Sequence, residues 1–464
     1  MRFIGMDIHR DFCEIAISED GVLRSVGRIE TTLEALAVMA SSFVEGDVVV
    51  LEATAGAGLI VDELKRGPAR VLVANTRRMP APGRAKTDRL DARMLARLAA
   101  SGLLETVWAP DEATRALRCI CARRDSLVRA RTRAKNETHA VLARNLCGRP
   151  PATDLFGKTG RAWLAEQMLA FDEQLTLDGC LRQIDFLDDE IEAMDRALAE
   201  RALASPEILR LLSVPGVALN TAACFMAAVG DIGRFDPAKK LVGYLGLDLR
   251  VRQSGNADAR HGRISKEGSA LARAMLGEAA WSVAMTPGPL KAFFERVRAR
   301  KGPQVAATAT ARKLACLFWC MLTREEDYAY ARPSMTRHKI RQLELAAGAP
   351  AQKGKKGVAG NRSPDLREQE RQLARQAEAA YCRTIADWKA AGPAKAGAGA
   401  TPGHASSRPS KNQAARQTTA QRSALRLVGH PHPPTASHSR RQRSRALDFH
   451  PSVITRSTVM PWRR

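Results

Sequence analysis

The order of short apolar runs in the first hundred residues most restricts the fold of this chain of 464 residues. Residues 3–9, 13–17 and 21–29 read as three consecutive strands, since polar and glycine-containing turns separate these apolar runs. Thr31-Thr32 can cap a helix, and a strand at 47–52 follows it. A helix near 57–66, a strand at 69–74 and a further helix complete the order βββαβαβα. This order predicts an α/β region, a mixed sheet with helices on its faces.

Four carboxylates stand where such a sheet would bring them together. Asp7 and Glu52 each end an apolar run, whereas Asp88 and Asp91 are three residues apart in a helical pattern and share one helix face. In a ribonuclease-H-like fold, acids arise from the first strand, the fourth strand and a late helix, and the spacing here fits. Acids packed together repel, so either their pKa values rise or a divalent cation lies among them. Oxygen ligands suit Mg²⁺ or Mn²⁺. Any one of these acids alone reads more simply as a solvated strand end or helix face.

The charge of the chain indicates a polyanionic partner. The formal net charge is +24 and the isoelectric point is about 10.3, which favours nucleic acid over other partners. Nine scattered cysteines without a C-x-x-C pair indicate reduced thiols, not a disulfide framework or a zinc site. The sequence has neither an apolar run of 18 residues nor the pattern of a signal peptide, so we expect a cytoplasmic protein without a membrane span.

Three basic segments are candidate contacts for nucleic acid, although each also fits a solvated surface. The first is the loop 75–86, which leads directly to Asp88. The second lies between residues 115 and 144, where the sequence has nine Lys or Arg and only two acids. Residues 250–268 are basic, rich in glycine and turn-forming, and they would expose Ser254 among positive groups. The candidate contact residues are Arg84, Lys86, Arg123, Arg129, Arg131, Arg133, Lys135, Arg252, Arg260 and Lys266.

Changes of pattern along the chain predict five regions. Residues 1–105 form the α/β region, 106–204 a helical coiled-coil region, and 205–332 a mainly helical region that contains Ser254. Residues 333–390 form a basic, helical extension. Residues 391–464 form a disordered basic tail, with twelve Lys or Arg against one acid from residue 401 onward. The tail either adds nonspecific affinity for nucleic acid or is a readthrough extension without function.

Three details of the helical regions are also expectations. Apolar residues between Leu177 and Leu198 have coiled-coil spacing, which leaves open whether their partner is the basic helix of the same chain or a second protomer. The turn 212–217 resembles a helix–hairpin–helix, a motif that presents backbone N–H groups to a DNA phosphate. The expected core residues of helices 269–284 and 303–323 are Leu276, Trp281, Leu317, Phe318 and Trp319.

Motifs in a fixed order make the chain resemble a known family. They are Gly5-Met-Asp7-Ile-His9, Glu52-Ala-Thr54, Lys86-Thr-Asp88-Arg-Leu-Asp91-Ala92, Gln253-Ser254-Gly255 and Ile264-Ser-Lys-Glu-Gly268. The chain is similar over roughly residues 1–345 to the insertion-sequence transposases of the DEDD type, the group numbered one-hundred-and-ten. This group includes the Piv-type DNA invertases and the bridge-RNA-guided recombinases.

The resemblance implies a RuvC-like N-terminal domain, a coiled-coil middle and a C-terminal transposase domain. It implies that Asp7, Glu52, Asp88 and Asp91 hold Mg²⁺ (or Mn²⁺) and that Ser254 is a nucleophile that forms a phosphoserine with DNA. It further implies element ends and target DNA as substrates and a structured guide RNA. A homodimer or homotetramer, in which the acids of one protomer face the serine of another, and a bacterial, nucleoid-associated location complete the expectation.

The chain departs from the family pattern at two positions that touch none of this chemistry. Leu249 stands where proline is usual, and Ser269 where asparagine is common. Three other functions remain open: a two-metal endonuclease without a covalent intermediate, a noncatalytic relic of a mobile element, and an ATP-binding domain of the actin type. The last requires a glycine-rich hairpin after the first strand, where this chain has Ile8-His9-Arg10-Asp11.

Overall fold

The computed structural model describes residues 1–54, 56–79, 87–255, 258–351 and 364–390. Arg84 and Lys86 lie outside the described residues, as does the predicted tail 391–464. What the sequence suggests for them therefore stays a prediction.

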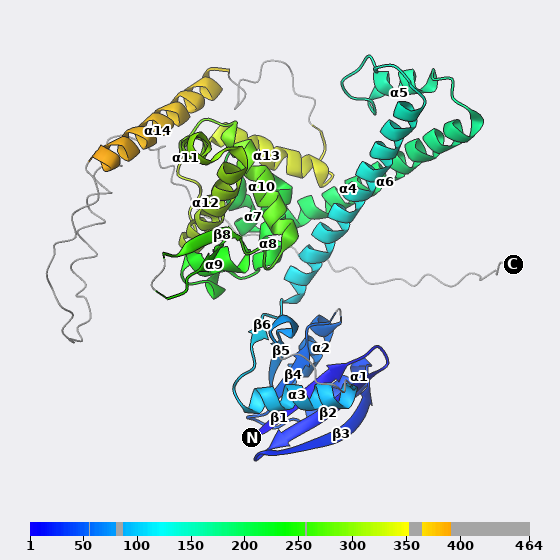
Figure 1. The fold of residues 1–464 in the computed structure, drawn as a ribbon, viewed down its shortest axis with the longest axis vertical. Helices are drawn as coiled ribbons and strands as arrows, with labels where there is room; N and C mark the ends of the chain where they lie inside the picture. The colour runs from blue at the N-terminus through cyan, green and yellow to red at the C-terminus, as the bar shows by residue number, and fades with distance from the viewer. Residues whose placement is uncertain (55, 80–86, 256–257, 352–363, 391–464) are drawn as a thin grey trace, which may run out of the picture. The chain divides into compact units, whose positions relative to one another are not determined.

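The N-terminal region is a six-stranded sheet with helices on both faces, drawn in blue in Figure 1. Its elements are β1 (Arg2–Ile8), β2 (Phe12–Glu19), β3 (Val22–Glu30), α1 (Leu33–Ser41), β4 (Val48–Glu52), α2 (Ala57–Leu64), β5 (Arg70–Ala74), η1 (Thr76–Arg78), α3 (Asp88–Ala100) and β6 (Thr106–Val107). The strand order is β3-β2-β1-β4-β5-β6. β1, β4 and β5 are parallel neighbours, whereas β2, β3 and β6 run antiparallel to their partners. The predicted βββαβαβα order is confirmed. Two short elements among the described residues were not expected: η1, which falls in the predicted loop 75–86, and the two-residue β6.

The two faces of the sheet bury alternate residues of the same strands. Ile4 and Met6 of β1 pack with α1 and α2 on one face. Val48 and Val50 of β4 pack with Leu95 of α3 on the other face. Because side chains alternate along a strand, Asp7 shares the face of Phe3 and Gly5, and Glu52 shares that of Val48 and Val50. Both acids therefore lie on the face that α3 covers.

Gly5 allows α3 to lie directly on β1. A Cβ atom at this position would come within 2.1 Å of the carbonyl oxygen of Ala92 and 2.6 Å of the amide nitrogen of Ala96. Both are backbone atoms of α3, so the contact is between helix backbone and strand backbone. The N-terminal end of α3 is held close to the end of β1 as a result.

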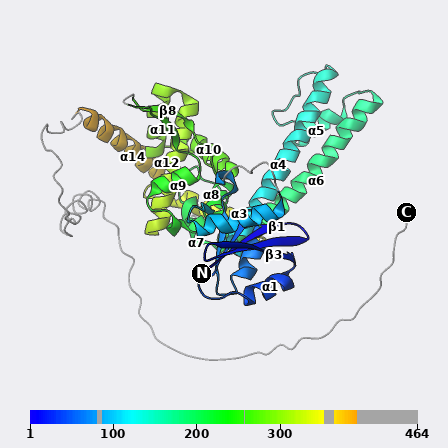
Figure 2. The ribbon, with the colours of Figure 1, turned by 60° about the horizontal axis from the view of Figure 1, so that its bottom comes forward.

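Two long antiparallel helices form the middle of the chain. α4 (Glu112–Arg144) and α6 (Phe171–Leu203) run side by side, with α5 (Lys158–Ala165) near their far end (Figures 1 and 2). Leu187 and Ile191 of α6 pack against Leu127 of α4, so the predicted apolar spacing finds its partner within the same chain. Ion pairs such as Arg123–Glu190 and Arg144–Glu173 follow the seam in antiparallel order.

The C-terminal region surrounds a large core with helices and one short hairpin. Its elements are α7 (Pro206–Leu212), α8 (Leu219–Val229), η2 (Ile232–Arg234), α9 (Ala238–Tyr244), β7 (Leu249–Arg252), β8 (Arg260–Ile264), α10 (Ala270–Ala284), α11 (Pro289–Lys301), α12 (Pro303–Arg324), α13 (Pro333–Ala346) and α14 (Pro364–Ala390). Among the described helices, α12 alone is long and apolar enough to cross a membrane, but half of its most apolar window is buried and it packs in this core. Such a helix reads as a core helix.

The predicted core residues of this region are confirmed with one exception. Leu276 and Phe318 are fully buried, and Leu317 and Trp319 pack against the same core. Trp281 is 43% exposed, so its assignment to the core was wrong. Small residues on the neighbouring helix α12 leave one side of the indole uncovered.

The turn 212–217 faces the interior and not solvent, so the expectation that it offers its backbone to DNA was wrong. Val214 and Val217 are buried, and a Cβ atom on Gly216 would lie 2.8 Å from the backbone nitrogen of Val283. The carbonyl groups of the turn accept three hydrogen bonds from the ammonium group of Lys339 on α13, at Leu212 (2.7 Å), Val214 (2.9 Å) and Val217 (2.8 Å). Burial, and then the charge of Arg332, lower the pKa of Lys339 to about 8.

We expect Lys339→Met to lower the free energy of unfolding by about 2 kcal/mol, because three carbonyl groups lose their donor at once. The comparable Arg337→Met on the exposed side of the same helix should change it by less than about 0.5 kcal/mol. Urea denaturation followed by circular dichroism measures both values. Equal midpoints for the two variants would contradict a structural role for the Lys339 ammonium group.

Candidate active site

The carboxyl ends of β1 and β4 place two of the predicted acids side by side. The last paired residues of these parallel strands are Met6 and Leu51, and Asp7 and Glu52 follow them directly. Neighbouring strands lie about 4.8 Å apart, so the two backbones deliver their carboxylates to the same short stretch of the sheet edge. Asp7 is buried and Glu52 is partly buried.

Helix α3 brings the other two acids to this edge. The side chain of Thr87 caps the helix by accepting a hydrogen bond from the backbone N–H of Leu90. Asp88 and Asp91 then fall in the first turn, where the positive end of the helix dipole favours carboxylates. The close packing of α3 at Gly5 brings this turn to Asp7, and Asp91 and Asp88 both act on the charge of Asp7.

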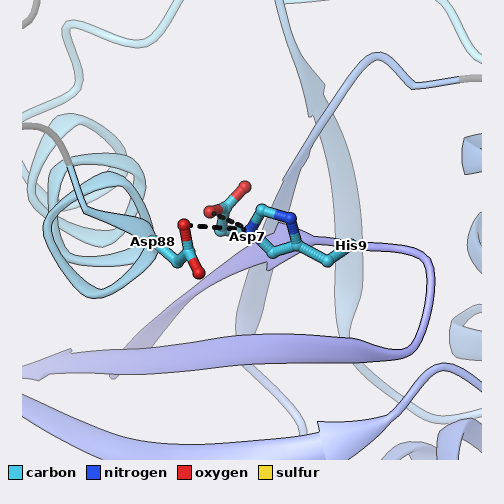
Figure 3. A group of neighbouring side chains, drawn as sticks. All are labelled: Asp7, His9 and Asp88. Carbon is cyan, nitrogen blue, oxygen red and sulfur yellow. Dashed lines mark hydrogen bonds and ion pairs between the residues drawn. The ribbon is translucent and has the colours of Figure 1, made fainter.

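His9 lies between two of the acids, as Figure 3 shows. Its Nε2 atom is 3.0 Å from an oxygen of Asp7 and 3.3 Å from an oxygen of Asp88. Ligand atoms of these three residues all lie within 4.8 Å of one another. Sequence reasoning placed His9 in a motif but gave it no role. Its position two residues after Asp7, on the same side of the chain, was the available signal.

The electrostatics of the site are those of crowded carboxylates. Burial raises the pKa of Asp7, its hydrogen bond with His9 lowers it, and the nearby charges of Asp91 and Asp88 raise it again, with a net upward shift. Arg28 of β3 offsets part of this charge, since it pairs with Glu14 at 2.8 Å and approaches Asp88 at 3.9 Å. Neither Arg28 nor His9 was among the predicted site residues.

The donor set fits a divalent metal. Carboxylate oxygens from β1, β4 and α3 at one sheet edge are the ligands that Mg²⁺ and Mn²⁺ prefer, and one imidazole nitrogen is more readily accepted by Mn²⁺. A cation at this position would offset the burial, and then the like charges of Asp91 and Asp88, that raise the pKa of Asp7. Asp7, His9 and Asp88 have ligand atoms close enough to one another to hold it. That Glu52 and Asp91 join them as ligands stays a prediction.

Ser254 lies in the exposed loop between β7 and β8. At the base of this hairpin, the hydroxyl group of Ser265 donates to the carboxylate of Asp248, and the backbone N–H of Ser265 donates to the carbonyl of Asp248 at 2.9 Å. Gly268 is required there, since a Cβ atom on it would lie 2.0 Å from the carbonyl oxygen of Tyr244. The base of the hairpin is thus fixed, and Ser254 is exposed.

Two arginines oppose each other on either side of the serine. Arg252 and Arg260 are cross-strand partners, and both are exposed. Like charges directly opposite on a hairpin are destabilising, so this pair is unfavourable without an anion. Among the described residues neither arginine has an acidic partner. Lys266, at the end of the hairpin, is likewise exposed.

Most of the basic residues of α4 that were predicted to contact nucleic acid already have a partner within the chain. Arg123 and Arg131 form ion pairs with Glu190 and Asp188 of α6, and Arg129 pairs with Asp125 one turn before it. The ammonium group of Lys135 lies 4.6 Å from the centre of the Phe156 ring. Arg133 is exposed and has no ion pair in the part of the chain that the structure describes. A role for these five residues in nucleic-acid binding stays a prediction.

Comparisons with known proteins identify relatives of both regions. Residues 209–295 match a family model described as the transposase IS116/IS110/IS902 family, and residues 4–145 match a transposase model of the DEDD type from IS110. The second match spans the four acids, and the first spans Ser254.

The chain matches most of the length of three curated relatives. A putative transposase (y4qE) of Sinorhizobium fredii is 28% identical over 353 residues, which are 69% of this chain and 88% of that protein. The transposase for insertion sequence element IS1111A of Coxiella burnetii is 26% identical over 336 residues, 71% of this chain and 91% of that protein. A probable family 20 transposase of Pseudomonas aeruginosa is 26% identical over 261 residues, 52% of this chain and 74% of that protein.

Proposed function

Because the chain belongs to the DEDD-type transposases of the IS116/IS110/IS902 family, we propose that it cuts and rejoins DNA through a phosphoserine intermediate on Ser254. In this proposal the N-terminal sheet is a RuvC-like, ribonuclease-H-like domain. Asp7, Glu52, Asp88 and Asp91 hold Mg²⁺ or Mn²⁺ at its edge. The substrates are the ends of an insertion sequence and its target DNA.

The observation that carries the proposal is the exposed serine between Arg252 and Arg260. An unfavourable pair of like charges is retained beside a hydroxyl group, and a phosphate placed between the two guanidinium groups would turn repulsion into two charge-assisted contacts. A phosphodiester held in this way lies against Ser254. The hydroxyl group is then positioned for attack on phosphorus.

The chemistry balances without an external energy source. The Oγ–P bond forms as the bond from phosphorus to the departing nucleotide oxygen breaks, the hydroxyl proton leaves, and the departing oxygen takes up a proton. The number of phosphodiester bonds is conserved, so a second hydroxyl can reverse the step and reseal the strands. The divalent metal, when bound, polarises the phosphate and neutralises its developing charge.

Assembly and guidance extend the proposal. The acids of one protomer would serve the serine of another, in a homodimer or homotetramer. A structured RNA from the element would select the DNA sites. The net charge of +24 suits both polyanions, and the reaction would take place at the bacterial nucleoid in the cytoplasm.

A two-metal endonuclease is the second candidate. The acid cluster forms within one chain and holds its own histidine, so it has what is needed to activate water without the serine hairpin. In that case Ser254 is only a contact to phosphate. A covalent bond between protein and DNA separates the two functions.

The test traps the intermediate on a denaturing gel. Labelled element-end DNA is incubated with Mg²⁺, RNA transcribed from the flank of the element, and either the wild type or one of three variants: Ser254→Ala, Asp7→Ala and the matched control Ser282→Ala. Ser282 is an exposed serine of the same region, and its hydroxyl group donates to the carbonyl of Glu278 one turn earlier in its own helix. We expect a protein–DNA adduct with the wild type and Ser282→Ala, and none with the other two.

Two results would argue against the phosphoserine. Equal cutting by the wild type and Ser254→Ala without any adduct would favour the endonuclease. An adduct that persists in Ser254→Ala would place the nucleophile elsewhere in the chain.

A further inference from the structure

A groove between α10 and α12 adjoins the base of the serine hairpin. It is lined by Leu247, which precedes β7, by Ile264, the last residue of β8, and by Trp281 of α10. Its volume is about 380 Å³, within the range of roughly 300–1,000 Å³ that small-molecule sites occupy.

Small residues open the groove. Ala274 and Gly277 of α10 face Ala307 and Ala311 of α12, and a Cβ atom on Gly277 would meet nothing within 4 Å. Glycine inside a helix lowers stability by about 1 kcal/mol relative to alanine. Since an alanine would fit at position 277, close packing does not explain the glycine there. The space lies directly beside the indole of Trp281.

Trp281 is held in place although it is 43% exposed. Its ring lies 5.4 Å from that of Phe294 at an angle of 61°, an edge-to-face contact that fixes its orientation. An exposed tryptophan of fixed orientation, next to an empty groove, is a surface on which a flat ring can stack.

The rim of the groove is positive and polar. Lys266 and Arg273 line it together with Gln304 and Thr308, and none of its described lining residues is acidic. One guanidinium nitrogen of Arg273 donates to the carbonyl groups of Leu245 (3.1 Å) and Glu267, which ties the groove to the base of the hairpin. The exposed Lys266 remains available to a phosphate group.

We propose that this groove receives a single nucleobase, which stacks on Trp281 while its phosphate contacts Lys266 and its edge faces Gln304 and Thr308. The inference rests on the proposed function, since it places a strand of nucleic acid along the serine hairpin. Leu247, in the wall of the groove, is seven residues from Ser254, so the two are at most about 23 Å apart along an extended chain. A nucleic-acid strand covers this distance in roughly seven bases, so the bound base lies within roughly seven positions of the reacting phosphate. Both DNA at the cleavage site and the guide RNA offer such a base.

The test measures binding without catalysis. Fluorescence anisotropy in EDTA gives the affinity for element-end duplexes that carry one abasic site at each successive position around the cleavage site. An equivalent scan uses the RNA transcribed from the flank of the element. The proteins are the wild type, Trp281→Ala, Trp281→Phe and Gly277→Leu, with Val305→Ala as control for an exposed apolar side chain of α12 that does not line the groove.

Removal of one base should weaken binding by the wild type about tenfold at one position, and at few others. Trp281→Ala and Gly277→Leu should bind the intact strand about tenfold more weakly and show no further loss at that position. Trp281→Phe should retain part of the loss, and Val305→Ala should match the wild type. The nucleic acid that shows this dependence identifies the source of the base.

Identical abasic profiles for the wild type and Trp281→Ala would overturn the inference and leave the proposed function intact. The same holds if Trp281→Ala changes only the oligomeric state, since a second copy of the chain would then occupy the groove. Failure of the wild type to bind either nucleic acid would overturn the proposed function, and this inference with it.

Discussion

Gly5→Val should destabilise the N-terminal region by about 3 kcal/mol or more. The first added carbon would lie 2.1 Å and 2.6 Å from backbone atoms of Ala92 and Ala96, and a helix backbone does not rotate away as a side chain does. Helix α3 would have to move away from β1, which would expose Ala92, Leu95 and Ala96, the residues of α3 that are fully buried. Urea denaturation followed by circular dichroism measures the loss.

The same substitution should also weaken the candidate metal site. Asp88 and Asp91 are in the first turn of α3, so a helix displaced from β1 takes them away from Asp7. Isothermal titration with Mn²⁺ should show weaker binding even where the variant remains folded. Gly243→Ala is the control, since a Cβ atom there meets nothing within 4 Å. A Gly5→Val protein as stable as the wild type would mean that β1 and α3 are not in close contact.

Asp7→Asn should abolish DNA cleavage and rejoining while raising the stability of the metal-free protein. In the proposed reaction Asp7 is a metal ligand, and the loss of such a ligand removes several kcal/mol of transition-state stabilisation, so we expect a rate at least about 10³-fold lower. The stability effect has the opposite sign. Because the pKa of Asp7 is raised in the folded protein, the folded state binds this proton more tightly than the unfolded chain does.

The ionised form of Asp7 therefore lowers stability at neutral pH, and stability is regained as the pH falls through the folded pKa toward the unfolded value of about 3.9. Asparagine resembles the neutral form at every pH. In EDTA, the melting temperature of Asp7→Asn should exceed that of the wild type at pH 7, and the difference should shrink at lower pH. Added Mg²⁺ should raise only the wild-type value.

Asp11→Asn is the matched control for this prediction. Asp11 is an exposed carboxylate in the turn after β1, and its substitution should alter neither the melting temperature nor cleavage. If Asp7→Asn melted below the wild type in EDTA, the ionised carboxylate would be stabilising, and the cost of burying its charge would not dominate. Undiminished cleavage would remove Asp7 from the reaction.

The positions of Asp7 and Glu52 at the ends of β1 and β4 could be predicted from the sequence because they depend on local features of each strand. Alternating apolar residues fix which side of β1 and β4 is buried, and the acids that follow the last paired residues must emerge at the same edge. The cap at Thr87 is equally local. His9 and Gly5 were within the same motif, but their roles depend on α3, which packs against β1 from some ninety residues later in the chain.

Long-range contacts account for what the sequence did not reveal. The apolar pattern marks Trp281 as a core residue, yet it does not report that the facing positions of α12 are alanines. A count of basic residues on α4 cannot show that α6 supplies acids to several of them. The turn 212–217 looks available for DNA in the sequence, but it is buried beside Val283 of α10, some seventy residues later in the chain.

The opposed arginines of the β7–β8 hairpin have one more consequence, a linkage between substrate and nucleophile. The free hairpin carries a penalty from Arg252 facing Arg260, and any anion that binds between them relieves it. An anion bound between the two guanidinium groups would therefore stabilise the pairing of β7 with β8. In the proposed reaction, this stabilisation would couple the binding of a strand to the positioning of Ser254, so the serine would react less readily when no strand is bound.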